Sequence, residues 1–324
     1  MKRIAAAAIA LTLALPATAQ EGSIKILVGF PAGASLDSMT RLVAEKMRTS
    51  LNQPVVVENR PGAGGQIAMT AVKNAAPDGL TIVMTPLVTV VTAPHIFPKL
   101  PYDAFADFAP VAHAADFLFA FGMGPATPAN SLQEYVALVK QDAKYGNYAS
   151  AATGSLPHFF SLLFAEKAGL KMNHIGYKGT APALTDLLGG QIASFMGTVS
   201  DVNAQHKAGK VRAVATSGAK RSRHMPDVPT FKELGFNIEG AGWYAAYAPA
   251  GTPAPVIERL SKAIVDRLNA EVVKAVNAPD VREKLDNFGM EPTGYGPAEL
   301  ARIHKRDYDQ WGPVIKASGF KPGS

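Results

Sequence analysis

The stretch from Ile24 to Asp37 constrains the fold more than any other part of the chain. It begins with a short, β-branched apolar run up to Val28, which predicts a buried strand. A turn rich in glycine and proline follows, and from Leu36 onward apolar residues recur at helical spacing. This order presents free backbone N–H groups at the positive end of a helix dipole, where a carboxylate or phosphate is stabilised. The stretch predicts either an anion-binding turn or an ordinary strand-to-helix connection, because a short glycine-rich turn does not decide between them.

Three residues of this turn can be weighed singly. Gly33 permits a positive φ and lets a ligand approach the backbone closely. Ser35 is either the N-cap of the helix or a hydroxyl turned toward a ligand. Asp37 would repel a carboxylate that faced it, so we expect it to stabilise the helix start and to orient N–H groups of the turn. A ligand that carries an amine would instead make Asp37 a direct contact.

The first nineteen residues have the pattern of an export signal. Lys2 and Arg3 form a basic segment, and residues 4–15 form an apolar segment that is too short to span a bilayer comfortably. An A-x-A cleavage signal ends at Ala19. We therefore expect a signal peptide over residues 1–19, cleavage after Ala19 and a mature protein located in the periplasm.

Composition narrows the class of protein further. The chain of 324 residues contains no cysteine, which excludes disulfides, thiolate catalysis and cysteine-based zinc sites. With 48% hydrophobic residues it can build a large core, and its length predicts about two domains. The net charge is +6, and removal of Lys2 and Arg3 leaves 30 basic against 26 acidic residues. The basic residues are scattered, which argues against a nucleic-acid partner; a mildly positive surface either collects small anions or only keeps the protein soluble.

Strand-like and helix-like segments alternate in both halves of the chain, which predicts parallel α/β sheets with right-handed crossovers. Ligands on such sheets bind beyond the carboxyl ends of the strands. Three loops have this position, at residues 30–35, 150–155 and 177–181. A cleft forms between two domains if the first loop lies in one and the other two lie in the second. The stretch from Gly122 to Pro128 is the expected crossover between them.

One tetrad keeps an enzyme hypothesis open. Ser217-Gly218-Ala219-Lys220 satisfies the S-x-x-K pattern of penicillin-recognising serine enzymes. The partner motifs S-D-N and K-T-G are missing, and no G-x-S-x-G, H-E-x-x-H or phosphate-binding Lys-Ser/Thr loop occurs. A periplasmic serine hydrolase that uses Ser217 and Lys220 is therefore the alternative to a binding protein. No metal or cofactor is predicted.

Longer motifs run in order through the chain after residue 19. They are Val28–Gly33, Gln53–Gly65, Ala76–Gly79, Leu100–Asp103, Tyr177–Gly179 with Ala181–Pro182, Asp186–Gln191, Met225–Thr230 and Ala248–Pro253. Together they resemble the Bug family of extracytoplasmic solute receptors, the substrate-binding components of tripartite tricarboxylate transporters. The resemblance covers essentially the whole mature chain.

The resemblance implies an α/β, two-domain type II periplasmic-binding-protein fold with a ligand cleft between the domains. The expected division is residues 20–122 and 240–324 for domain 1 and residues 123–239 for domain 2. Such a receptor captures a small carboxylate by hinge closure and delivers it to a membrane permease, without catalysis. We expect a monomer whose partners are the solute and either permease subunits or a membrane sensor. A ligand-dependent sensory module without transport is the second hypothesis.

The family's binding loops can be carried over by motif. In the first domain they point to Phe30, Ala32, Gly33, Ser35 and Asp37, and in the second to Ala151, Thr153, Gly154, Ser155, His158, Tyr177, Lys178, Gly179 and Ala181. Among these, His158 either donates to a carboxylate or is an ordinary hydrogen-bonded residue. Lys178 either neutralises an anion or is a solvated surface lysine, so we favour the backbone around Gly179 as the contact.

The chain departs from the family pattern at two positions. Many members have a second glycine at the position of Ala34, so we expect a stiffer turn here. The family often has an acidic residue, commonly near the ligand, at the position of Ala193. Its absence and the apolar neighbours favour a carboxylate without an amine, including an aromatic one. Dicarboxylates, tricarboxylates and aromatic carboxylates all stay open.

Overall fold

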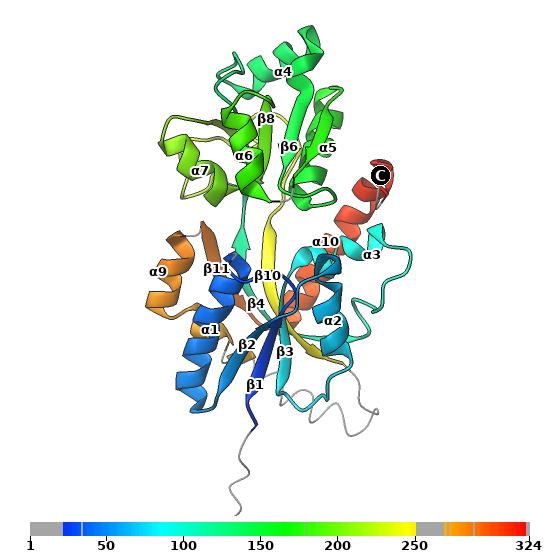
Figure 1. Ribbon diagram of the computed structural model, residues 1–324, viewed down its shortest axis with the longest axis vertical. Coiled ribbons are helices and arrows are strands. Elements are labelled where there is room, and N and C mark those ends of the chain that lie inside the picture. The colour runs from blue at the N-terminus through cyan, green and yellow to red at the C-terminus, as the bar shows by residue number, and fades with distance from the viewer. Residues whose placement is uncertain are drawn as a thin grey trace, which may run out of the picture.

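The computed structural model describes residues 22–33, 35–177, 179–250, 269–270, 272–287 and 289–321. These residues form two lobes, one above the other in Figure 1, and each lobe is built on its own sheet. The expected signal peptide lies outside the described residues. The expected helix over residues 254–269 does so too, apart from Asn269.

The first lobe contains a six-stranded mixed sheet. Its strands lie in the order β11 (Met290–Tyr295), β4 (Phe108–Phe117), β10 (Gly242–Pro249), β3 (Thr81–Pro86), β1 (Ile24–Val28) and β2 (Val55–Asn59). β1 is parallel to β2 and β3, whereas β10 is antiparallel to β3 and β4. The predicted strand before the first turn is therefore an interior strand of the sheet, beside the edge strand β2.

Helices cover both faces of this sheet (Figure 1). One face carries α1 (Ser35–Leu51) and α9 (Pro279–Asn287); the other carries α2 (Gln66–Lys73), α3 (Ala93–Ile96) and α10 (Pro297–Ala317), with the short helices η1 (Ala63–Gly65) and η2 (Leu87–Thr89). The alternation of β1 sorts its side chains between the two faces, because neighbouring residues of a strand point in opposite directions. Ile26 and Val28 pack with α1, and Leu27 packs with α2.

The second lobe contains a five-stranded sheet. Its strands lie in the order β7 (Asn173–Gly176), β6 (Asn147–Ser150), β8 (Ser194–Thr198), β5 (Phe119–Met123) and β9 (Arg212–Thr216). Its helices are α4 (Leu132–Gln141), η3 (Ala143–Gly146), α5 (Leu156–Ala168), α6 (Thr180–Leu188) and α7 (Val199–Lys207). The sequence from Ser131 to Glu134 predicts a capping box at the start of α4, and the Ser131 side chain does accept from the Glu134 N–H at 3.1 Å.

Two features of the sheets differ from the sequence expectation. The strands β4 and β11 were not predicted, because β4 is rich in alanine and contains Pro110, while β11 contains Pro292 and Gly294. The sheets are also mixed instead of purely parallel, since β5 and β10 are antiparallel to their neighbours. These two strands are entered from the opposite lobe and not through a crossover helix, which frees them from the parallel direction.

The chain passes between the lobes at two points. It leaves the first sheet through Leu118, between β4 and β5, and returns through Ala241 to β10. β5 already pairs with β8 and β9, so the crossing precedes the stretch from Gly122 to Pro128 that the sequence indicated. The expected boundary between residues 122 and 123 thus falls inside β5.

A single side chain ties the two crossing segments together. Ser217 is fully buried, and its Oγ accepts from the Phe119 N–H at 3.0 Å and donates to the Gly240 carbonyl at 2.8 Å. Beside this tie, Gly242 lies opposite Phe117, and a Cβ added at Gly242 would clash with the Phe117 ring. The two segments therefore form one hydrogen-bonded unit.

Candidate functional site

The loop between β1 and α1 is organised by Asp37, whose side chain is only 4% exposed. Its Oδ2 accepts from the Gly33 N–H at 2.9 Å and from Arg41 Nε at 3.0 Å. Its Oδ1 accepts from Asn59 Nδ2 at 2.9 Å, and the same amide reaches the Phe30 carbonyl at 3.1 Å. Burial raises the pKa of Asp37, but these hydrogen bonds outweigh burial and hold it below its usual value. Asp37 therefore orients the turn, as the sequence indicated.

Gly33 and Ser35 are two other residues of this loop that the sequence singled out. Gly33 has φ +87°, where a β-branched residue is strained, and an added Cβ would meet no atom within 4 Å. The hydroxyl of Ser35 makes no hydrogen bond with another described residue. Ala32 is exposed beside them, and Ala34 lies outside the described residues. The loop thus offers an open glycine, an uncommitted hydroxyl and the first-turn N–H groups of α1.

The loop between β6 and α5 is held by two stacked histidines. His158 is buried, and its Nδ1 accepts from the Gly154 N–H at 3.1 Å. Its ring stacks on His174 with centroids 3.8 Å apart. Burial, and then the neighbouring His174, lower the pKa of His158 to about 4, so the ring is neutral at pH 7. His158 therefore uses Nδ1 to position the Gly154 backbone.

The third predicted loop braces the second. The Gly179 N–H donates to the Ala151 carbonyl at 2.8 Å, so the backbone group favoured by the sequence as an anion donor is already engaged. The Tyr177 hydroxyl donates to Asp186 at 2.6 Å within the same lobe. Ala181 is exposed in the first turn of α6, and Lys178 lies outside the described residues.

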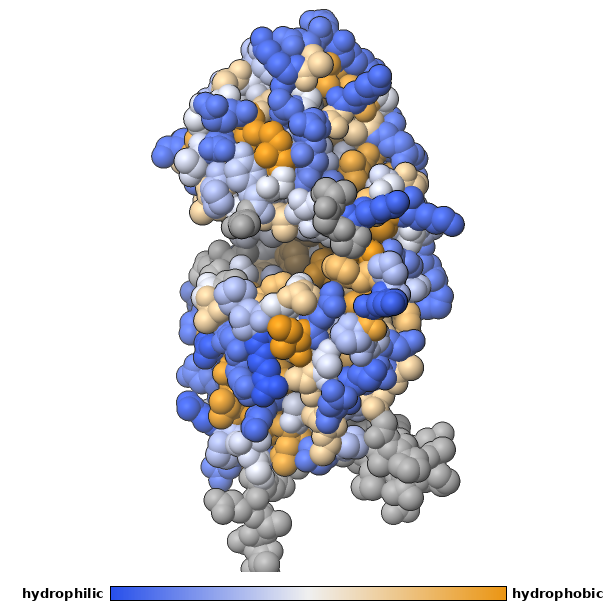
Figure 2. All heavy atoms as spheres, turned by 45° about the vertical axis from the view of Figure 1, so that its right-hand side comes forward, coloured by the Kyte–Doolittle hydropathy of each residue, from blue (hydrophilic) through white to orange (hydrophobic). Residues whose placement is uncertain are grey.

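A cleft of about 510 Å³ lies where the two lobes meet, and Figure 2 shows the hollow between the lobes with hydrophobic residues at its floor. Four predicted site residues line it, namely Phe30, Thr153, Gly154 and Ser155. The other lining residues were not predicted; they are Gly64, Val88, Thr92, Ala93, Ile96, Phe97, Ala152 and Phe320. The other predicted residues within the described ranges flank this cleft or brace its loops without lining it.

The missed residues carry weak sequence signals. Residues 93–97 form a single helical turn and the residue after it, and Phe320 follows a Ser-Gly pair beyond the last helix. The position of Ala193 was also misjudged. It precedes β8 and bonds to Asn147 and Thr127, at the strand end opposite the loops of the cleft. Ala193 therefore does not line the cleft.

The geometry of Ser217 does not support a nucleophile. Its oxygen accepts one backbone hydrogen bond and its proton is donated in another, so neither is available to a substrate. The side chain is fully buried, while Lys220 is exposed. The S-x-x-K tetrad is thus part of the connection between the lobes.

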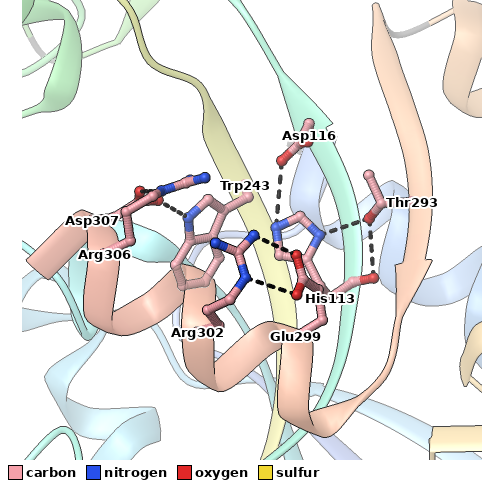
Figure 3. Close-up of polar contacts among 8 residues, drawn as sticks. All are labelled: His113, Asp116, Trp243, Thr293, Glu299, Arg302, Arg306 and Asp307. Carbon is pink, nitrogen blue, oxygen red and sulfur yellow. Dashed lines mark hydrogen bonds and ion pairs between the residues drawn. The ribbon is translucent and has the colours of Figure 1, made fainter.

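A second cleft, of about 430 Å³, lies beside the connection and against α10. Figure 3 shows polar contacts beside this cleft, among residues of β4, β10, β11 and α10. Trp243 Nε1 donates to Asp307 Oδ2 at 2.8 Å, and both residues are buried, so Trp243 packs in the core. Burial and then Asp307 raise the pKa of Asp116 to about 7. None of these polar contacts was predicted from the sequence.

In the described part of the chain, no helix is both long and apolar enough to cross a bilayer. The histidines and carboxylates of the same residues form no group of three that would hold a metal ion.

The sequence and the fold are both similar to those of known proteins. The family described as "Tripartite tricarboxylate transporter family receptor" matches residues 39–320. BugT of Bordetella pertussis is 32% identical over 303 residues, which cover 92% of this chain and 90% of BugT. MatC from Rhodopseudomonas palustris, solved with bound malate, superposes with a TM-score of 0.76 at 31% identity and covers 91% of this chain and 99% of its own. A second R. palustris protein, solved with adipate, gives a TM-score of 0.80 at 28% identity, covering 92% and 98%.

Fold and cleft together define the class: a two-lobed α/β receptor with the type II periplasmic-binding-protein fold. Within that class, the chain belongs to the tripartite tricarboxylate transporter family of receptors, which includes the Bug proteins. The resemblance drawn from its motifs is thereby confirmed.

Proposed function

We propose that this protein is a periplasmic receptor that captures a small carboxylate between its two lobes. One observation carries the proposal: a single cleft is lined by Phe30 of the first lobe and by residues 152–155 of the second. A ligand that contacts both lobes binds the closed state better than the open one, and this difference shifts the population toward closure. The malate and adipate bound to the two R. palustris relatives support a carboxylate as the ligand class.

In this proposal the carboxylate lies between the starts of α1 and α5. The hydroxyls of Ser35 and Thr153 have no hydrogen-bond partner among the described residues, and the first-turn N–H groups of each helix have no acceptor within that helix. Both helix dipoles favour a negative charge at this place. Asp37 and His158 act indirectly, because each holds the backbone N–H of a loop glycine. Phe30 is a wall of the cleft.

In the proposal, the other residues expected at the site shape or brace the binding loops. Gly33 keeps the first loop open, Ala32 lies exposed before α1, and Ala181 lies exposed in the first turn of α6. The Gly179 and Ala151 pair and the Tyr177 hydroxyl brace the second lobe. A contact from Lys178 stays a prediction.

We place the hinge at Leu118 and Ala241, which separates one lobe of residues 20–117 and 242–324 from another of residues 119–240. Closure about these points would bring the two loops together on the solute. Export through the segment at residues 1–19, a monomeric state and delivery to a membrane permease belong to the same proposal and rest on family membership. A sensory role without transport predicts the same binding event.

The test is a thermal-shift screen of the chain from residue 20 onward against malate, adipate, citrate, hexanoate and benzoate, with the corresponding primary amides as controls. A ligand about a hundredfold above its Kd should raise Tm by about 5 °C, because it binds only the folded state. The amides should produce no shift. A nitrocefin hydrolysis assay runs in parallel. Absence of a shift with every carboxylate, or hydrolysis that is lost in Ser217→Ala, would overturn the proposal.

A further inference from the structure

The end of the chain forms part of the cleft. α10 stops at Ala317, and Gly319 then takes φ +67°, a conformation that glycine adopts without strain. The Ser318 hydroxyl donates to the Ile315 carbonyl at 2.6 Å and accepts from the Phe320 N–H at 3.2 Å. This turn ends the helix and directs Phe320 into the lining of the cleft.

The helix that carries Phe320 is attached to the first lobe. His95 of α3 donates from Nε2 to the Tyr308 carbonyl at 2.9 Å. Gly312 allows the close approach of the two helices, because a Cβ at this position would lie 2.7 Å from the His95 ring. Farther back, Trp243 Nε1 donates to Asp307. These contacts fix α10 against β10 and α3.

Phe320 nevertheless packs on the second lobe. Its ring meets those of His158 and Phe159 edge-on, with centroids 5.6 and 5.7 Å away. A Cβ added at Gly154 would lie 3.0 Å from the Phe320 ring, so the side chain lies against the backbone of the loop between β6 and α5. One aromatic ring, carried by a helix of the first lobe, thus packs against the second lobe beside the loop proposed to hold the carboxylate.

The cleft is polar at the start of α5 and largely apolar elsewhere. Thr153 and Ser155 supply hydroxyls at the start of α5, whereas Phe30, Phe97 and Phe320 belong to a largely apolar remainder. None of the described residues that line the cleft carries a charge. A solute with charged groups at every end would leave a carboxylate desolvated against apolar side chains, which is costly. An alkyl or aryl body would instead be removed from water.

We propose that Phe320 is a specificity-determining residue, which selects a solute with one carboxylate on an apolar alkyl or aryl body. This inference rests on the proposed function and narrows its ligand class. The carboxylate lies at the hydroxyls of the loop, and Phe320 covers the apolar body.

Isothermal titration of the chain from residue 20 with hexanoate, benzoate and citrate tests the inference. The unsubstituted protein should bind hexanoate or benzoate at least about tenfold more tightly than citrate. Phe320→Ala should weaken binding of the apolar acid about tenfold and change citrate binding less than about twofold. Phe320→Leu should keep most of the preference, because leucine remains apolar. Phe236→Ala is the matched control, since Phe236 packs on Phe164 and does not line the cleft.

The outcomes separate the two claims. If no carboxylate binds the unsubstituted protein, the proposed function fails and this inference fails with it. If carboxylates bind but citrate binds best, or if the ratio of affinities is the same in Phe320→Ala, the inference alone is overturned. If Phe320→Ala does not fold, Phe320→Gln decides: it should lose the preference for the apolar acid, because a polar side chain replaces the ring, and a preference as strong as that of Phe236→Ala overturns the inference.

Discussion

His113 turns Nε2 toward Asp116, whose Oδ1 lies 3.4 Å away, yet Nε2 has no hydrogen-bond partner within the described residues (Figure 3). Thr293 determines where the ring proton lies. Its hydroxyl donates to the His113 carbonyl at 3.1 Å, so it accepts from Nδ1 at 2.6 Å. Nε2 is then an unprotonated acceptor that faces a carboxyl group. An ionised Asp116 would place two acceptors together, which agrees with its raised pKa.

Stability should depend on pH through this pair. The pKa of Asp116 rises from 3.8 to about 7, so between these values the folded protein holds a proton that the unfolded chain has released. The free energy of unfolding therefore falls as pH rises through this range. Burial, and then Arg306, lower the pKa of His113 from 6.5 to about 4. This shift makes the free energy of unfolding rise with pH between about pH 4 and 6.5, opposite to the effect of Asp116.

Asp116→Asn separates the two contributions. Between pH 5 and 8, the unsubstituted protein should lose stability relative to Asp116→Asn, as measured by urea unfolding at each pH. Because the Asp116 side chain is 35% exposed, solvent screens part of its interactions and reduces this difference in unfolding free energy. Asp309→Asn, on the exposed side of α10, is the control. If the free energies of unfolding of the protein and of Asp116→Asn change with pH in parallel, Asp116 does not hold the additional proton in the folded state.

Gly33→Val should weaken carboxylate binding by at least about tenfold, because a β-branched residue at φ +87° displaces the turn and its N–H groups. The strain should also cost about 1–3 kcal/mol of stability. Gly235→Val is a matched control, since Gly235 also has φ +87°, has no atom within 4 Å of an added Cβ and does not line the cleft. Calorimetry and urea unfolding of both variants separate strain from binding. Full affinity in Gly33→Val would count against the site.

Asp37→Asn should destabilise the protein by about 2 kcal/mol, because an amide cannot accept from all the donors that surround the carboxylate. Because the pKa of Asp37 is lowered on folding, its contribution to the free energy of unfolding is present above pH 3.8 and is lost as pH falls through the folded pKa. Glu45→Gln, an exposed change on the same helix, should be nearly neutral. Equal unfolding free energies for the two variants would disprove the organising role.

Ser217→Ala should cost about 1–3 kcal/mol, because the buried Phe119 N–H and the part-buried Gly240 carbonyl lose their partner. Ser161→Ala is a milder control, since the buried Ser161 hydroxyl bonds to a carbonyl of its own helix. Denaturant unfolding measures both changes. A Ser217→Ala variant as stable as Ser161→Ala would show that the tie is unimportant.

The sequence predicted those parts whose local pattern and final structure agree. The run before the first turn is apolar and β-branched, and it becomes β1, an interior strand of a sheet. Glycine in that turn and hydroxyl residues at the start of α5 likewise indicated where a cleft would form. These are short-range signals, which depend on a few neighbouring residues.

The missed parts depend on contacts between distant segments. The Ala-rich segment of β4 is a strand because β10 and β11 pair with it on both sides, and its own strand preference is weak. Phe320 lines the cleft because α10 brings it beside a loop more than 150 residues earlier in the chain. The role of Ser217 is of the same kind, since its partners lie 98 and 23 residues away.

The Ser217 tie also limits how the lobes can move. A single extended segment between two bodies permits rotation about its own axis as well as bending. Two segments joined side by side by a shared hydroxyl resist that rotation and leave bending as the easier motion. The faces of the cleft would therefore meet in the same relative orientation at every closure, and one buried hydroxyl would control the alignment of loops that it never touches.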